Sequence, residues 1–247
     1  MNKTNLDAHR SAYQENFKYH SENIEMLSWY ASKVASAINA RFPEKVLSLG
    51  IGHQVTSNTI IAAIDTISKK YLIVEGSGQI IQDYRNKVAL PRKVEIVPSL
   101  FENFESNEPF DIIEMGFVLE HIDDPSKILA HYKKMLKKNG LLFIAVPNAR
   151  SLHRMLGYHA GLLDDLYQLS DADLNLGHKR YFDLEGIKNL IMKSGLIIRK
   201  VEGIYLKPFT TDQIANLHLS NDISKALFKI GVHYPELSNA IFVEAGI

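Results

Sequence analysis

The sequence contains no cysteine among its 247 residues. This absence excludes disulfide bonds, thiolate metal ligands and a cysteine nucleophile. It also fits a chain that works in a reducing compartment, and we expect a cytoplasmic location. Catalytic chemistry therefore has to come from histidine, carboxylate, hydroxyl or amine side chains.

Net charge and long apolar runs are missing as well. Lysine plus arginine number 28, as do aspartate plus glutamate, so no bulk field attracts nucleic acid or an anionic membrane. The longest apolar runs, such as residues 141–146, are strand-sized and fall far short of the roughly 20 residues of a membrane span. The first residues show no apolar core of a secretory signal. We therefore expect a small-molecule partner and neither nucleic acid nor a membrane.

A strand–turn–helix–strand pattern from Glu44 to Glu75 organises the rest of the chain. Its turn is Gly50-Ile51-Gly52-His53, and its second strand ends on Glu75. Glycines allow a sharp turn and a close approach of a ligand to the backbone. An acid at a strand tip can accept hydrogen bonds from ribose hydroxyls. The pattern predicts a βαβ unit that binds an adenosine-containing ligand, although Val55 replaces the third glycine of the dinucleotide fingerprint and so argues against NAD.

The other predicted elements alternate between helix and strand. We expect helices over residues 5–41, 77–88, 125–138, 183–194 and 211–231, and strands over residues 94–97, 110–115, 141–146, 196–205 and 240–245. Asn139-Gly140 is typical of a helix end. Such alternation implies an α/β fold with a mostly parallel sheet, right-handed crossovers and helices on both faces.

Length and apolar content, 46%, suit a single domain over residues 1–247. We divide it into an N-terminal helical cap, a ligand-binding core, an insertion and the C-terminal part of the sheet, at residues 1–41, 42–147, 148–182 and 183–247. The insertion is long for a crossover and leaves the sheet at a carboxyl edge. This is where a lid or a substrate pocket is expected.

Four segments carry a more specific pattern: residues 46–52, residues 110–125, residues 140–148 and residues 178–182. The first reads Val-Leu-Ser-Leu-Gly-Ile-Gly, and the second ends in Val-Leu-Glu-His-Ile-Asp-Asp-Pro. Together they resemble the motifs of class I S-adenosylmethionine-dependent methyltransferases of the small-molecule type. The likeness covers about residues 40–205, and the second segment is its most specific part.

This resemblance implies a Rossmann-like sheet of seven strands whose last strand, from Ala240, is antiparallel. It also implies S-adenosylmethionine as the cofactor, with the glycine turn at the methionine part and Glu75 at the ribose. The expected cofactor-binding residues are Tyr13, Ser48, Gly50, Gly52, His53, Glu75, Gly76, Ser99, Leu100, Phe101, Met115 and Phe117. Taken alone, Phe101 and Phe117 are equally consistent with core packing.

Two positions depart from the family pattern. Ser48 stands where the family usually has an acid that helps to hold the methionine amine, and Gln54 stands where a small residue is usual. Serine accepts a hydrogen bond but brings no charge. The departure is consistent with weaker cofactor binding, with compensation by an acid such as Glu114, or with a chain that has lost catalysis.

Histidines supply the candidates for a general base, because imidazole titrates near neutral pH. His121 follows the fourth predicted strand, close to the cofactor edge, although a histidine in this motif also fits a packing role. His178 and Tyr19 are the other catalytic candidates, with His153 and His159 as further histidines. No ligand spacing on one helix stands out, so we predict no metal site.

We therefore predict methyl transfer to oxygen or nitrogen of a small molecule, such as a sugar, a polyketide, a peptide-like compound or another secondary metabolite. A methyltransferase fold without turnover that serves as a binding module is one alternative, supported by Ser48. An NAD-type oxidoreductase is the other. The sequence leaves the oligomeric state open, and a homodimer is compatible with it.

Overall fold

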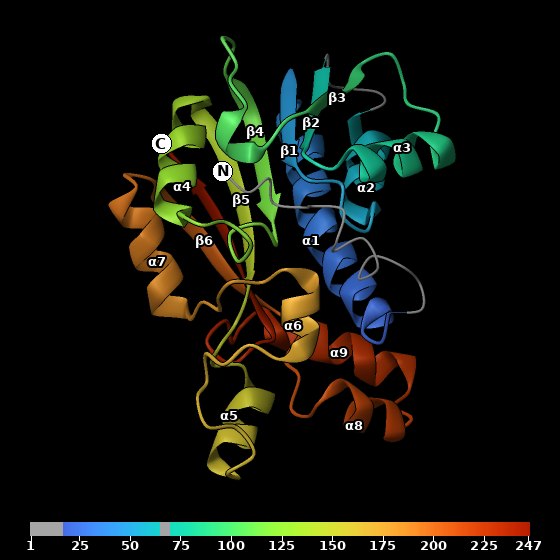
Figure 1. The fold of residues 1–247 in the computed structure, drawn as a ribbon, viewed down its shortest axis with the longest axis vertical. Helices are drawn as coiled ribbons and strands as arrows, with labels where there is room; N and C mark the ends of the chain where they lie inside the picture. The colour runs from blue at the N-terminus through green and yellow to red at the C-terminus, as the bar shows by residue number, and fades with distance from the viewer. Residues whose placement is uncertain (1–16, 65–69) are drawn as a thin grey trace. The chain divides into compact units, whose positions relative to one another are not determined.

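The computed structural model of the chain describes residues 17–64 and 70–247 (Figure 1). They fall into two compact units. The first contains the chain up to Gly116 together with Lys127–Phe143 and Gly246–Ile247, and the second contains Phe117–Ser126 and Ile144–Ala245. Each unit is described by itself below.

The strands form one sheet in the order β3-β2-β1-β4-β5-β7-β6. Their bounds are Lys45–Leu49 (β1), Lys70–Glu75 (β2), Val94–Pro98 (β3), Phe110–Gly116 (β4), Leu136–Pro147 (β5), Ile197–Ile204 (β6) and Ala240–Gly246 (β7). β1 pairs in parallel with β2 and with β4, and β2 pairs in parallel with β3. β7 is antiparallel. The predicted α/β class, the seven strands and the antiparallel last strand are confirmed.

In the first unit, α1 (His20–Arg41) packs against α2 (Val55–Ile64) and β4. Its buried face consists of Met26, Tyr30, Ala31, Val34 and Ile38, which recur at helical spacing. Residues 17–19 form a bend and turn before His20. Our prediction of helix from residue 5 is therefore wrong for these residues, and its earlier part lies outside the described ones. α3 (Gly78–Lys87) is capped by Ser77, whose hydroxyl accepts from the backbone of Ile80.

The helix predicted over residues 125–138 ends earlier than expected. α4 covers Pro125–Lys134, and β5 begins at Leu136, so Asn139 and Gly140 lie inside the strand. Pairing with β4 explains the difference, because the N–H of Phe110 donates to the carbonyl of Met135 at 2.8 Å. The chain therefore joins the sheet before Asn139 and Gly140, so this pair does not end the helix.

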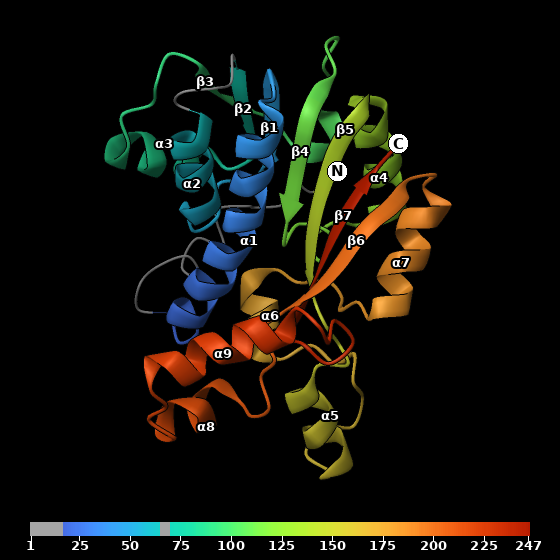
Figure 2. The same ribbon diagram turned by 180° about the vertical axis from the view of Figure 1, so that it is seen from behind.

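The second unit holds the predicted insertion and the end of the sheet. Its helices are α5 (Leu152–His159), α6 (Asp171–Leu176), α7 (Leu184–Lys193), α8 (Thr211–Asn216) and α9 (Asn221–Gly231). α7 and α9 contact β6, and Figure 2 shows α7 beside that strand. The single helix predicted over residues 211–231 is in fact two, because Ser220 caps a new helix through a hydrogen bond from the N–H of Ile223.

Candidate active site

The glycine turn follows β1 as predicted. Gly50 has φ +86° and Gly52 has φ +47°, values that glycine adopts without the cost a side chain brings. The N–H of Gly50 donates to the carbonyl of Val74 at 2.8 Å, which ties the turn to the end of β2. A methyl group added at Gly50 would lie 3.6 Å from the ring of Phe101. Phe101 therefore faces the turn, within reach of a ligand that crosses it.

Glu75 lies at the tip of β2 and is buried. One carboxylate oxygen accepts from the N–H of Ile51 at 3.0 Å, and the other accepts from the N–H of Ser77 at 2.8 Å. The acid therefore fixes both the glycine turn and the entry to α3. Sequence reasoning assigned Glu75 a ribose contact and missed this backbone role.

The residues expected around the adenine lie at the ends of β2 and β3. The N–H of Ser99 donates to the carbonyl of Glu75 at 3.1 Å, so the two strand ends stay together. Leu100 is exposed and Phe101 half-buried, while Gly76 is half-buried beside Glu75. The first unit thus gathers most of the predicted cofactor residues at the carboxyl edge of three parallel strands.

His53 closes the glycine turn and packs edge-on against His20, with ring centroids 5.4 Å apart. Burial, with His20 beside it, lowers the pKa of His53 to about 4. His53 is therefore neutral at neutral pH. Tyr19 lies just before α1, half-buried and edge-on to Phe17 at 5.9 Å. Tyr13 lies outside the described residues.

Ser48 belongs to a buried polar cluster beneath the turn. Its hydroxyl lies 2.7 Å from the hydroxyl of Tyr71, and it pairs across the sheet with Glu114 on β4. The Glu114 carboxylate accepts from the hydroxyl of Tyr30 at 3.0 Å and from the N–H of Gly116 at 3.1 Å. Burial raises the pKa of Glu114 to about 7, although hydrogen bonds from Ser48, Gly116 and Tyr30 act against it. An acid therefore stands next to Ser48, on the neighbouring strand.

Met115 and Phe117, expected near the sulfonium, differ in exposure. Met115 is completely buried, main chain included, so it does not line an open surface. Phe117 is half-buried, and its φ of +58° is unusual for an aromatic residue. Its N–H donates to the carbonyl of Ala145 at 2.8 Å, which holds this conformation. Such backbone strain clusters at functional sites.

The second unit brings two of the catalytic candidates together. The rings of His121 and His178 meet edge-on with centroids 4.9 Å apart. The carboxylate of Glu120 joins them, and one ligand atom from each of the three residues lies within 4.8 Å of the others. Glu120 is completely buried, and burial raises the pKa of its carboxyl to about 7, with His178 acting against the rise. Among the described residues this is the one such group of histidine and acid side chains.

Asp173, at the start of α6, fixes His178. Nδ1 of His178 lies 3.2 Å from an oxygen of Asp173. Burial alone would raise the pKa of Asp173, but hydrogen bonds from His178 and Ser170 lower it to about 2. The carboxyl is therefore ionised and also accepts from the hydroxyl of Tyr181 at 3.0 Å. Arg154 stacks on the other side, with its guanidinium carbon 4.1 Å from the centroid of the Tyr181 ring.

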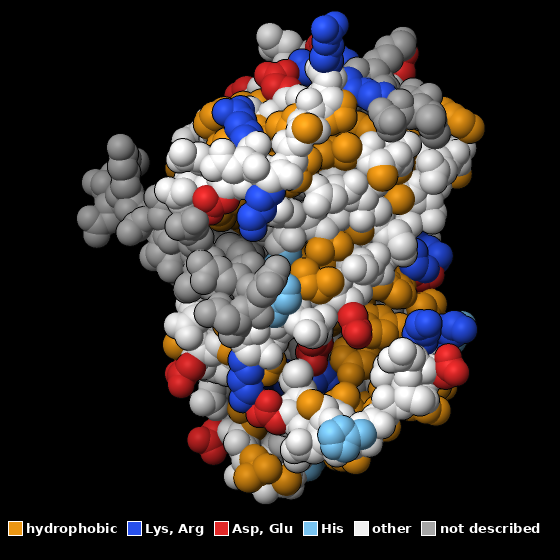
Figure 3. Space-filling model, turned by 90° about the vertical axis from the view of Figure 1, so that its right-hand side faces the viewer, with side chains coloured by type: hydrophobic (Ala, Val, Ile, Leu, Met, Phe, Trp, Pro, Cys, Tyr) orange, Lys and Arg blue, Asp and Glu red, His pale blue; other side chains and the backbone are white. Residues whose placement is uncertain are grey.

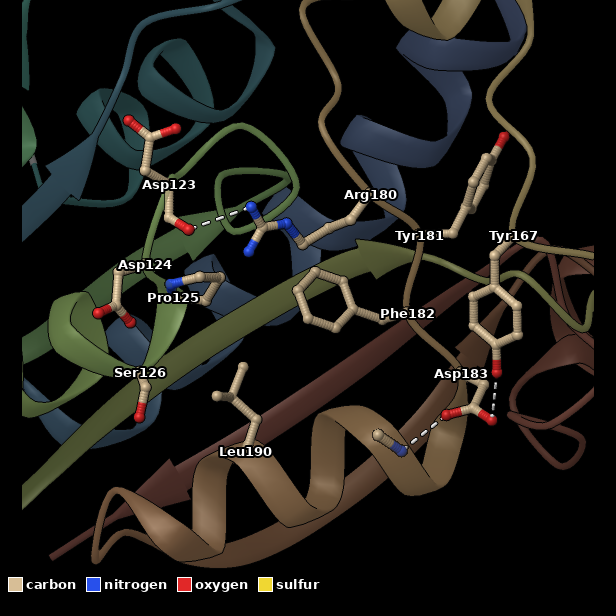
Figure 4. Close-up of a pocket in the computed structure, with 11 residues that line it drawn as sticks. Asp123, Asp124, Pro125, Ser126, Tyr167, Arg180, Tyr181, Phe182, Asp183 and Leu190 are labelled. Carbon is tan, nitrogen blue, oxygen red and sulfur yellow. Dashed lines mark hydrogen bonds between the residues drawn. The ribbon is translucent and has the colours of Figure 1, made fainter.

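Lys179 and Arg180 hold the His178 segment against the loop after β4. The N–H of Lys179 donates to the carbonyl of Glu120 at 2.8 Å, and its ammonium bonds Asp123. The guanidinium of Arg180 donates to the carbonyl of Asp123 at 3.1 Å, as Figure 4 shows. These two side chains thus stabilise the loop after β4.

A pocket of about 510 Å³ lies beside Arg180 and the loop after β4. It is lined by residues 123–126, Tyr167, residues 180–183, Gly186 and Leu190. Figure 4 shows the hydroxyl of Tyr167 bonded to Asp183, at 2.9 Å, on one side. Two of the lining residues, Tyr181 and Phe182, follow His178 closely in the sequence. The pocket and the histidine pair therefore share one segment of the chain.

The other histidines of the insertion lie outside the cluster. His153 is largely buried, and burial together with Lys207 and Arg154 lowers its pKa to about 3. His159 is exposed and packs on Tyr158. Sequence reasoning missed Glu120 and Asp173. A signal existed for each: Glu120 directly precedes His121, and Asp173 completes a capping box with Ser170.

The family model for a methyltransferase domain matches residues 26–201. A ubiquinone biosynthesis O-methyltransferase of Pasteurella multocida (strain Pm70) is 29% identical over 129 residues, 47% of this chain and 52% of that protein. One of Parvibaculum lavamentivorans is 28% identical over 113 residues, 42% of this chain and 40% of that protein. The chain thus spans about half the length of the curated relatives that it matches.

Solved structures share the fold. The plantazolicin methyltransferase BpumL, in complex with SAH, has a TM-score of 0.61 at 13% identity, covering 99% of this chain and 90% of that one. The N-methyltransferase NodS from Bradyrhizobium japonicum WM9, also in complex with SAH, has a TM-score of 0.58 at 10% identity, covering 98% and 97%. Since the family model covers well over half of the sequence, the chain belongs to the methyltransferase-domain family, the class I S-adenosylmethionine-dependent methyltransferases.

Proposed function

We propose that the protein transfers a methyl group from S-adenosylmethionine to an oxygen or nitrogen atom of a small molecule, with oxygen favoured. The observation that carries the proposal is that the buried Glu75 carboxylate accepts hydrogen bonds from the backbone N–H groups of Ile51, in the glycine turn, and Ser77. Support for oxygen comes from the curated relatives, which are named O-methyltransferases, and from the polar cluster around His121. Sugars, polyketides, peptide-like compounds and other secondary metabolites remain the substrate classes that we propose.

The residues of the first unit fit this cofactor. A glycine turn, a buried carboxylate at the tip of the neighbouring strand and an aromatic ring beside the turn match a methionine chain, a ribose and an adenine. The cofactor supplies the reactive methyl group, and the protein has to bind, orient and exclude water. Glu114, next to Ser48, is our candidate to replace the missing acid.

The second unit supplies the groups that handle the acceptor. A hydroxyl acceptor has to lose a proton as it is methylated, and His121 and His178 lie together beside Glu120. An imidazole of this cluster can accept the proton directly, or the cluster can make the hydroxyl easier to deprotonate. Tyr19 remains the rival candidate in the first unit.

The charge distribution supports a small-molecule partner. On the face shown in Figure 3, Lys and Arg side chains are interspersed with Asp and Glu, as the balanced composition suggests. Clustered positive charge would be expected for a nucleic-acid partner. Among the described residues, no helix is long and apolar enough to cross a membrane.

Two alternatives have weaker support. A binding module without turnover is supported by Ser48 alone, and Glu114 stands beside it. An NAD-type oxidoreductase would need the third glycine that Val55 replaces. Calorimetry with S-adenosylmethionine, SAH and NAD distinguishes the methyltransferase from the oxidoreductase. A methyltransferase has to bind S-adenosylmethionine and SAH, whereas an oxidoreductase of this type has to bind NAD.

The decisive experiment is a methyl-transfer assay with S-adenosylmethionine labelled in its methyl group. Acceptors are offered in matched pairs that share a scaffold and differ only in a hydroxyl or an amine. We expect label in hydroxyl members, and none with a Gly50→Val variant. Label only in amine members would overturn the preference for oxygen. Tight binding of SAH with no transfer to any acceptor class would favour the binding module.

A further inference from the structure

We propose that Glu120, His121 and His178 bind a divalent transition-metal cation, with Asp173 as the residue that positions His178. The inference deepens the function proposed above, because a cation there would act as a Lewis acid toward an acceptor oxygen. The site itself rests only on contacts within the second unit and can be tested without cofactor or acceptor.

The donor set fits such an ion. Two imidazoles and one carboxylate suit zinc, iron, cobalt or manganese, whereas magnesium prefers oxygen ligands alone. Donors at about 2.0–2.2 Å from a shared ion lie roughly 3–4 Å from one another. The three donor atoms are within 4.8 Å of one another, so small side-chain shifts would complete the site. Three protein ligands leave further coordination positions for water or an acceptor.

Glu120 supplies an independent observation. Its side chain has no exposed surface, and neither carboxylate oxygen has a hydrogen-bond partner among the described residues. Leaving a buried carboxylate without a partner is costly. The ammonium of the nearby Lys179 does not serve it, because that group bonds Asp123. A cation held with His121 and His178 would give Glu120 the partner that residues 17–64 and 70–247 do not provide.

Asp173 completes the arrangement. Metal-binding histidines usually donate their second ring N–H to a carboxylate, which fixes the tautomer and the orientation of the ring. Nδ1 of His178 lies 3.2 Å from an oxygen of Asp173 but makes no aligned hydrogen bond in this arrangement, so a small turn of the ring would form that bond and leave Nε2 for the ion. Asp173 is in turn held by Ser170 and Tyr181. Asp173 is therefore a fixed partner toward which the His178 ring can turn when an ion binds.

The chain also brings the ligands together without a metal. Lys179 bonds the backbone of Glu120, and Lys179 and Arg180 both contact Asp123. The ligands come from two loops 57 positions apart in sequence, at residues 121 and 178. Because these bonds hold the loops in register, the site does not have to pay the full ordering entropy when the ion binds.

The test measures metal binding to the full chain after removal of metal with a chelator. Cobalt(II) is titrated and followed by its visible absorption, and zinc binding is measured by calorimetry. We expect one cobalt per chain. Glu120→Gln and His178→Ala should each weaken binding by more than about 100-fold, and Asp173→Asn by about 10–100-fold. His159→Ala, at an exposed histidine of the same unit, is the control and should bind as the wild type does.

The proposal fails if the stripped wild-type chain binds no cobalt, or if Glu120→Gln and His178→Ala both bind it normally. Thermal unfolding shows whether the variants fold, and the isosteric Glu120→Gln decides the outcome if His178→Ala does not. A chain that methylates without metal would leave the proposed function intact and make the cluster a direct proton acceptor. A chain that binds metal but methylates nothing would keep the site and reject the function.

Discussion

Glu114 gives a prediction whose size follows from the structure. The residue is 3% exposed, and its carboxyl contacts Tyr30 and the backbone of Gly116. Burial raises its pKa from an ordinary 4.5 to about 7. The folded chain therefore keeps a proton on Glu114 over a pH range in which the unfolded chain has lost it.

The sign of the effect follows from this difference. The stability that the protonated Glu114 contributes is fully present below about pH 4.5 and is lost as the pH rises toward 7. Each pH unit costs about 1.4 kcal/mol, so 7 − 4.5 = 2.5 units correspond to about 3 kcal/mol. Glu114→Gln removes the titration. The free energy of unfolding of the variant, relative to wild type, should rise by about 3 kcal/mol between pH 4.5 and pH 8.

Urea unfolding followed by circular dichroism at several pH values measures the difference. Comparing variant with wild type cancels the titration of the other groups, Glu120 included. Glu105→Gln, at an exposed position, is the matched control and should follow the wild-type profile. Parallel profiles for wild type and Glu114→Gln would refute the reasoning, because they would show that Glu114 titrates alike in the folded and unfolded chains.

Three other predictions concern function. Gly50→Val should abolish SAH binding measured by calorimetry while the fold survives, whereas Gly195→Val, which also replaces a left-handed glycine, should cost stability and spare binding. His121→Ala should lower turnover at least about 100-fold with SAH affinity near normal, and normal turnover would remove His121 from the chemistry. Hydrogen exchange over residues 148–182 should slow when SAH binds, and protection limited to the glycine turn would reject a lid.

The sequence predicted the sheet well because its signals are local. Apolar runs, glycine turns and caps such as Asp183 before α7 each act within a few residues. The errors arose where tertiary contacts decide. Asn139-Gly140 would end a helix in isolation, but the bond from β4 to Met135 draws the chain into the sheet before it, and β5 runs through it.

The candidate site divides in the same way. Glu75 and the glycine turn were located from sequence because both sit in one βαβ unit. The backbone contacts of Glu75 could not be predicted, because the sequence shows that a glutamate ends the strand but not which groups its carboxylate binds. The grouping of Glu120 with His178 was also missed, because it depends on contacts between distant loops that no spacing rule encodes.

The most direct test of the account is SAH affinity in a Glu75→Ala variant, measured by calorimetry against wild type. Hydrogen bonds to a charged acceptor contribute about 1.5–3 kcal/mol, so we expect the dissociation constant to rise roughly 10- to 150-fold. Glu75→Gln and thermal unfolding show how much of the loss comes from the freed N–H groups of Ile51 and Ser77. Glu95→Ala, on the neighbouring strand and exposed, should bind as wild type does. An unchanged dissociation constant in a folded Glu75→Ala variant would contradict the assignment of this edge as the cofactor site.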